Sequence, residues 1–129
     1  MKRNEFIATC MLGLLGGCAG TKYLTAPIEG DSLVVPLDSF LEKKYIVVEN
    51  DKLEYPVCVY KFPDGSYKAL LMKCTHQGTE LQVFGDRLQC PAHGSEFTNT
   101  GAVQNGPADR ALRTFNVTVL DTSLKIKLA

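Results

Sequence analysis

This chain of 129 residues has no long apolar segment, no net charge and only two histidines. The apolar run Phe6–Leu15 is too short to span a bilayer as a helix. Fourteen basic residues balance fourteen acidic residues, and the net charge of zero gives no indication of a nucleic-acid partner. Low-complexity runs and internal repeats are also missing. At this length we expect one domain rather than two.

The chain has only two histidines, and both lie in a window that also holds two of its five cysteines. The first group reads Cys74-Thr75-His76-Gln77-Gly78, which is C-x-H. The second group, Cys90-Pro91-Ala92-His93-Gly94-Ser95-Glu96-Phe97, contains C-x-x-H. Each group supplies one thiol and one imidazole, and this set of four donors predicts a metal site.

Two kinds of metal centre suit two cysteines and two histidines. A structural zinc ion uses the same donors, but zinc sites favour a C-x₂₋₄-C spacing, and the first group here is C-x-H. The glycines that follow each histidine fit loops that wrap a larger body and point backbone N–H groups at sulfide ions. The pattern therefore favours a [2Fe–2S] cluster, with zinc as the alternative.

The two groups resemble the C-x-H-x-G and C-P-x-H-G-S signatures of Rieske iron–sulfur proteins, and Gly106-Pro107-Ala108 resembles the loop that shields the cluster in that family. The resemblance implies one [2Fe–2S] cluster per chain, with Cys74 and Cys90 on one iron and His76 and His93 on the other. It further implies that the surroundings of the cluster include Gly78, Gly94, Ser95, Phe97 and Pro107.

The resemblance also implies a subtype. High-potential members carry an extra cysteine in each loop, joined as a disulfide, and these positions correspond to Thr79 and Ala92. Those members also place a tyrosine hydroxyl near a cysteine sulfur, where this chain has Phe97, whereas Ser95 is retained. Rieske centres span roughly −150 to +300 mV, and one hydrogen-bond donor of two predicts a potential on the order of 0 to +150 mV.

The N-terminal residues read as a targeting segment. Lys2 and Arg3 precede the apolar run, and residues 15–18, Leu-Gly-Gly-Cys, resemble the lipobox of bacterial lipoproteins. We therefore expect residues 1–17 to be a signal peptide, Cys18 to carry the lipid, and residues 18–32 to be a tether. Asn4 stands where a twin-arginine signal has its second arginine, so the export route stays open. A plain secretory signal is the alternative.

The rest of the chain, residues 33–129, reads as short strands between turns. Strands are expected over 33–37, 45–49, 56–62, 67–73, 81–84, 87–90, 112–120 and 124–128, with hairpin turns at 63–66 and 85–86. Asp38 or Ser39 could cap one helical turn, 99–110 reads as an irregular connection, and Cys58 reads as a buried thiol. The pattern predicts an all-β domain, and the Rieske resemblance implies stacked antiparallel sheets with the two metal loops at one tip.

A one-electron carrier is the expected function. Two histidines used as ligands leave none for a Ser/His/Asp site or for the mononuclear iron of a ring-hydroxylating oxygenase. We expect redox proteins as donor and acceptor, and a lipid anchor on the periplasmic or cell-surface side of a bacterial membrane. An electron-transfer subunit of a larger periplasmic oxidoreductase or quinol-oxidising complex, and a zinc-stabilised binding module without redox activity, are the alternatives.

Overall fold

The structure of the chain, a computed structural model, describes residues 23–92 and 94–128. One short 3₁₀ helix, η2 (Leu37–Ser39), accompanies twelve strands in this part of the chain. The strands are β1 (Tyr23–Thr25), β2 (Ile28–Glu29), β3 (Ser32–Pro36), β4 (Tyr45–Glu49), β5 (Val57–Lys61), β6 (Tyr67–Leu71), β7 (Gln82–Phe84), β8 (Arg87–Gln89), β9 (Glu96–Thr98), β10 (Val103–Asn105), β11 (Thr114–Val119) and β12 (Ser123–Lys127). The all-β prediction is confirmed.

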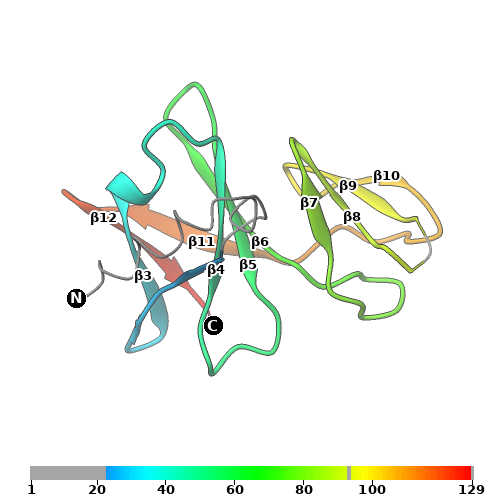
Figure 1. Cartoon of the computed structure of the whole chain (residues 1–129), viewed down its shortest axis with the longest axis horizontal. Helices are drawn as coiled ribbons and strands as arrows, with labels where there is room; N and C mark the ends of the chain where they lie inside the picture. The colour runs from blue at the N-terminus through cyan, green and yellow to red at the C-terminus, as the bar shows by residue number, and fades with distance from the viewer. Residues whose placement is uncertain (1–22, 93, 129) are drawn as a thin grey trace, which may run out of the picture.

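The strands form two sheets. Eight of them follow the order β1-β4-β5-β6-β11-β12-β3-β2, and the other four follow β10-β9-β8-β7. All neighbours are antiparallel except β1 and β4, which are parallel. Strand β11 is shared: Thr114 and Phe115 pair with β6, and residues 116–119 pair with β12. The larger sheet therefore curls into two halves, and the smaller sheet stands to one side of it (Figure 1).

The middle layer consists of β4, β5 and β6, because their side chains alternate between two cores. On β5, Cys58 and Tyr60 belong to a core shared with the four-stranded sheet, whereas Val57 and Val59 belong to a core shared with β3 and β12. A strand that is buried on both faces has no solvent side. This explains why β5 has a continuous run of four buried residues, from Val57 to Tyr60, instead of alternating.

Both predicted hairpins are present. Strands β5 and β6 pair across residues 63–66, and β7 and β8 pair across Gly85 and Asp86. Two predictions were wrong. The connection over 99–110 contains β10, which pairs with β9 through an irregular register. The residue that precedes η2 is Pro36, and neither Asp38 nor Ser39 caps the helix.

The predicted tether needs a correction, since strands of the domain are already present from Tyr23. Strand β1 pairs with β4, β2 pairs with β3, and Ala26 between them is only 1% exposed. Leu24 and Ile28 pack against the same core as Ala26, so this segment is part of the domain rather than a linker. The predicted signal peptide, Cys18 and residues 19–22 lie outside the described residues.

No helix in residues 23–92 or 94–128 has the length and hydropathy that are needed to cross a membrane.

Candidate metal centre

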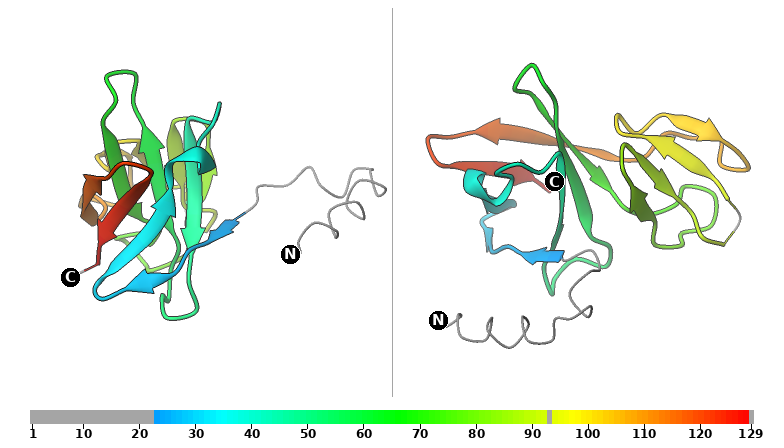
Figure 2. Two further views of the ribbon diagram at one scale, coloured as in Figure 1. Left: turned by 90° about the vertical axis from the view of Figure 1, so that its left-hand side faces the viewer. Right: turned by 45° about the horizontal axis from the view of Figure 1, so that its top comes forward.

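Two loops that border the four-stranded sheet carry the predicted donors. The first loop follows β6 and precedes β7, and the second joins β8 to β9. Figures 1 and 2 show these loops next to each other at the end of the molecule that is farthest from β12. The β7–β8 hairpin connects them, as the spacing of thirteen residues between His76 and Cys90 predicted.

The backbones of the two loops close in the same way. The N–H of Gly78 donates to the carbonyl of Cys74 at 2.8 Å, and the N–H of Gly94 donates to the carbonyl of Cys90 at 3.0 Å. Each cysteine N–H donates to the carbonyl five residues later in the chain. Cys74 donates to the carbonyl of Thr79 at 2.9 Å, and Cys90 donates to the carbonyl of Ser95 at 2.8 Å. Gly78 and Gly94 have φ angles of 75° and 79°, which glycine adopts without strain.

The two cysteines lie at the inner end of their loops. Cys74 and Cys90 are each 1% exposed and belong to the same cluster of buried side chains. The N–H of His76 points to the Sγ of Cys74 at 3.4 Å, and such a donor stabilises a sulfur that carries negative charge. His76 itself is exposed, whereas His93 lies outside the described residues. No disulfide joins any two of the described cysteines.

The residues predicted around the cluster are distributed as follows. Ser95 is fully buried, and its Oγ accepts a hydrogen bond from the N–H of Ala108 at 3.0 Å. This bond ties the loop of Pro107, which is exposed, to the second cysteine loop. Phe97 is fully buried in the same hydrophobic core as Cys74 and Cys90.

Three supporting contacts were missing from the sequence interpretation. Thr75 and Arg110 form a reciprocal pair, in which the Thr75 hydroxyl donates to the Arg110 carbonyl at 2.8 Å and Nη2 of Arg110 donates to the Thr75 carbonyl at 3.0 Å. The hydroxyl of Tyr55 donates to the carbonyl of Gly78 at 2.6 Å. These contacts join residues 35 and 23 positions apart, and no periodic pattern in the sequence indicates them.

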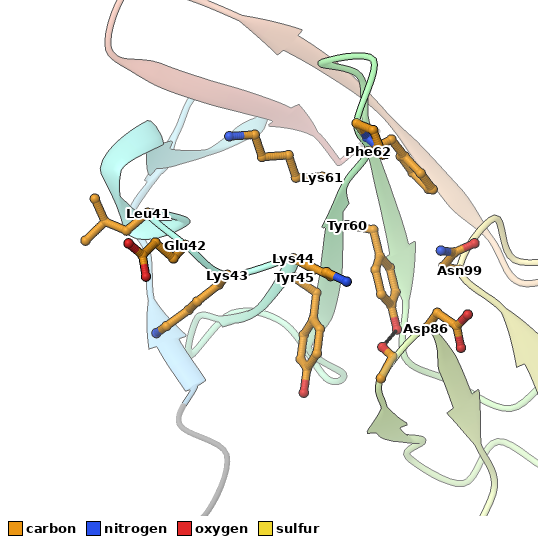
Figure 3. Close-up of a pocket in the computed structure, with 12 residues that line it drawn as sticks. Leu41, Glu42, Lys43, Lys44, Tyr45, Tyr60, Lys61, Phe62, Asp86 and Asn99 are labelled. Carbon is orange, nitrogen blue, oxygen red and sulfur yellow. Dashed lines mark hydrogen bonds between the residues drawn. The ribbon is translucent and has the colours of Figure 1, made fainter.

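The third contact joins the two sheets. The hydroxyl of Tyr60 on β5 donates to the carbonyl of Gly85, in the turn between the two metal loops, at 2.9 Å (Figure 3). Tyr60 is 2% exposed, and burial is the main cause that raises its pKa. The neighbouring Cys58 is 0% exposed, which confirms the predicted buried thiol, and this burial raises its pKa to about 12. Tyr60 is therefore a neutral donor that anchors the hairpin.

The described donors suit a two-iron cluster. A [2Fe–2S] cluster needs two protein donors at each iron, and its sulfides accept hydrogen bonds from backbone N–H groups. Two buried cysteines in matching loops, with a histidine in each loop, meet the first need. Among residues 23–92 and 94–128, no three histidine, cysteine, aspartate or glutamate side chains converge to hold a single ion. His93 is not among these residues.

Comparisons with known proteins agree with the donor set. The family model described as "Rieske [2Fe-2S] domain" matches residues 30–116. Iron–sulfur subunit 2 of the cytochrome b6-f complex from Nostoc sp. PCC 7120 is 28% identical over 110 residues, which are 84% of this chain and 49% of that protein. The oxygenase component of dicamba O-demethylase from Stenotrophomonas maltophilia is 34% identical over 70 residues, which are 52% of this chain and 21% of that protein.

A solved structure supports the same family. The plasma-membrane Rieske protein PetC3 from Synechocystis PCC 6803 is 29% identical, with a TM-score of 0.62 over 72% of this chain and 95% of that chain. The matches cover between 21% and 65% of the length of these curated relatives. Since the family model covers most of the domain and both loops, the chain belongs to the Rieske [2Fe–2S] domain family and binds a [2Fe–2S] cluster.

Proposed function

We propose that this protein carries single electrons at the exported face of a bacterial membrane, to which a lipid on Cys18 attaches it. Electron transfer through the cluster follows from the family. The observation that carries the ligand assignment is the matched pair of loops, in which Cys74 and Cys90 are both buried in the same hydrophobic core. We assign Cys74 and Cys90 to one iron and His76 and His93 to the other.

The chain's own groups prepare the site for this role. The glycine turns and the Cys N–H bonds hold the backbone of both loops, so each cysteine is presented from a closed turn. The N–H of His76 points to the Sγ of Cys74, and the Oγ of Ser95, which accepts from the N–H of Ala108, keeps its own proton available for donation. When bound, the cluster supplies the redox chemistry, namely the gain or loss of one electron. The exposed His76 marks the side of the site that meets solvent.

Metal analysis of the purified full-length chain tests the cluster. We expect two irons, two acid-labile sulfides and no zinc per chain, with a rhombic Rieske-type EPR signal after reduction. Cys90→Ser should abolish this signal. Cys58→Ser is the matched control, because Cys58 is equally buried but lies on β5, and its variant should keep the signal. A colourless protein with one zinc would overturn the assignment in favour of a zinc-stabilised module.

The lipid anchor has its own test. Residues 19–22 separate Cys18 from β1, so a lipid on Cys18 would hold Tyr23 within roughly 18 Å of the attachment point. A single residue with several acyl chains gives stable anchoring. Metabolic labelling with an alkyne fatty acid should mark the wild type and the Cys10→Ala control but not Cys18→Ala, and only Cys18→Ala should leave the membrane fraction. Labelling of Cys18→Ala would refute the anchor.

A second candidate is a subunit of a larger oxidoreductase. The named relative from Nostoc is a subunit of a cytochrome complex, and this favours the same arrangement here. Thr79 and Ala92, which replace the loop cysteines of high-potential members, speak against a quinol-oxidising role. Crosslinking in native membranes, followed by purification, separates the two cases: a stable stoichiometric partner supports the subunit, and recovery of the chain alone supports the free carrier.

A further inference from the structure

A basic pocket opens beside the first cysteine loop. It has a volume of about 440 Å³, and three of the residues that line it are cationic: Lys73, Arg110 and Arg113. Its wall includes Cys74 and Thr75, so it reaches the first loop itself. No carboxylate lines the pocket among the described residues. This lining concentrates positive potential next to Cys74, which we assign as an iron ligand.

The arginine nearest to the loop keeps most of its charge available. Nη2 of Arg110 donates to the carbonyl of Thr75 at 3.0 Å, a bond that orients the guanidinium without neutralising it. Asp109 is the nearest carboxylate in an ion pair, with 4.0 Å between its Oδ1 and Nε of Arg110. Both side chains are well exposed, at 92% and 75%, so this pair contributes little and is screened by salt.

The other two cations are held by groups without formal charge. Nη2 of Arg113 donates to the carbonyl of Leu128 at 3.0 Å, and its guanidinium lies 4.8 Å from the ring centroid of Phe115. Nζ of Lys73 lies 5.4 Å from the ring centroid of Tyr55. Such contacts fix the position of a cation and leave its charge to act on a ligand. Among the described residues, the exposed pair of Arg110 with Asp109 is therefore the one ion pair that these three cations form.

We propose that the basic pocket is where an acidic protein surface, that of the electron-transfer partner, docks. The inference deepens the proposed function and rests on it. Carboxylates of the partner would meet Lys73, Arg110 and Arg113, and the partner's redox centre would approach the cluster across the backbone of Cys74 and Thr75. Opposite charges on two proteins steer their encounter and raise the rate of association.

A second groove provides a matched control. Figure 3 shows Lys43, Lys44 and Lys61 near a groove between β4, β5 and the β7–β8 turn. The lining of this groove also includes the carboxylates of Glu42 and Asp86, so its positive charge is partly balanced. Three lysines can be neutralised there with the same change of net charge as in the basic pocket.

The test uses a small anionic oxidant on the cluster-loaded, full-length protein. The reduced protein loses one electron, and hexacyanoferrate(III) gains it to become hexacyanoferrate(II), with no bond made or broken. Stopped-flow rates are measured for the wild type, for Lys73→Gln/Arg110→Gln/Arg113→Gln and for Lys43→Gln/Lys44→Gln/Lys61→Gln. The cationic oxidant tris(phenanthroline)cobalt(III) is measured in parallel.

We expect the pocket variant to react about tenfold more slowly with hexacyanoferrate(III) at low salt, because three nearby charges are removed within about a Debye length. Its rate should also depend less on ionic strength. The groove variant should change by less than about twofold, and the cationic oxidant should react with the pocket variant no more slowly than with the wild type. An equal loss in both variants, or no loss in the pocket variant, would overturn the proposal.

Two further variants separate charge from structure. Arg110→Lys keeps the charge, so its rate should stay near that of the wild type. Lys73→Gln/Arg113→Gln leaves the link between Arg110 and Thr75 intact and should lose rate without loss of folding. A slow Arg110→Lys variant, together with an unaffected double variant, would show a structural role and refute the docking surface.

The acidic polypeptide is probed separately. Poly-L-glutamate, which has no redox activity, should slow the oxidation of the wild type by hexacyanoferrate(III) and leave the pocket variant unaffected. If only phosphatidylglycerol vesicles compete, the pocket faces lipid headgroups and the proposal of a protein partner fails. The proposed function fails in a different way, since a wild-type protein without a Rieske-type EPR signal would give no electron transfer to measure.

Discussion

Replacement of Ser95 with alanine perturbs a hydrogen bond that joins the second cysteine loop to the loop of Pro107. Ser95 is fully buried, and its Oγ accepts from the N–H of Ala108 at 3.0 Å. Ala108 is 4% exposed, so water cannot replace the lost acceptor without a rearrangement. A buried donor left without a partner costs about 1–3 kcal/mol. We expect Ser95→Ala to lower the free energy of unfolding by this amount and the Tm by several degrees.

The same change should lower the reduction potential. The Oγ of Ser95 accepts the Ala108 bond through a lone pair, so its own proton remains available for a sulfide of the cluster, as the family pattern implies. This donor stabilises the reduced form, which is more negative. If the bond is stronger by about 1 kcal/mol in that form, its loss lowers the potential by about 40 mV, since 59 mV corresponds to a tenfold change for one electron.

Ser32→Ala is the matched control. Ser32 is 8% exposed, but its Oγ donates to Oδ1 of the exposed Asp31 at 3.1 Å, and its removal leaves no buried donor without an acceptor. Urea unfolding should therefore show a loss below about 1 kcal/mol for Ser32→Ala. Protein-film voltammetry should give an unchanged potential for this control and a lower one for Ser95→Ala.

Three results of this experiment are informative. A loss of stability without a change of potential would show that Ser95 only holds the loops together. A change of potential without a loss of stability would show that the Ala108 bond contributes little. If neither quantity changes relative to Ser32→Ala, the reasoning about Ser95 is refuted. A wild-type potential well below −100 mV would independently refute the predicted range of roughly 0 to +150 mV.

Three other changes test the support of the two loops. Tyr60→Phe removes the donor to Gly85, and since that carbonyl is near solvent we expect urea unfolding to show a loss of about 0.5–1.5 kcal/mol, with no loss if the bond is unimportant. Gly101→Ala should cost more than Gly65→Ala, because both have φ near +90° but only at Gly101 would the new Cβ lie 3.1 Å from a buried leucine methyl; equal melting temperatures would contradict this. Burial raises the pKa of Cys58 from 9.0 to about 12, so iodoacetamide should not label it at pH 8, and stability should fall as the pH rises from about 9 to about 12; rapid labelling of the folded protein would exclude this burial.

Strands with clear turn signals were predictable, whereas short polar strands were not. The turn residues 63–66 and 85–86 made two hairpins predictable, because their Gly and Asp residues stand between apolar runs. Strand β10 (Val103–Asn105) carries no buried residue and pairs irregularly with β9, so neither propensity nor alternation indicated it. The strands at residues 23–29 looked like a linker since each has only two or three residues.

The donors of the site could be predicted, but their support could not. Cysteine and histidine are rare in the chain, so their grouping in two loops is visible in the sequence alone. Tyr55, Tyr60 and Arg110 are common residue types, and their contacts with the loops span 23, 25 and 35 positions. Only the fold brings these groups together. The functional residues that sequence reasoning missed are therefore those that position the site.

The similarity of the two loops indicates how the chain can vary the properties of its site. Backbone hydrogen bonds and the glycines at 78 and 94 close both loops, so the folding of each loop depends little on the side chains between cysteine and glycine. Those positions differ: the histidine is third in the first loop and fourth in the second. Ala92 in the second loop, and Thr79 just after the first, replace the disulfide of high-potential members. Because closure does not need that disulfide, its absence can lower the potential without the loss of either loop.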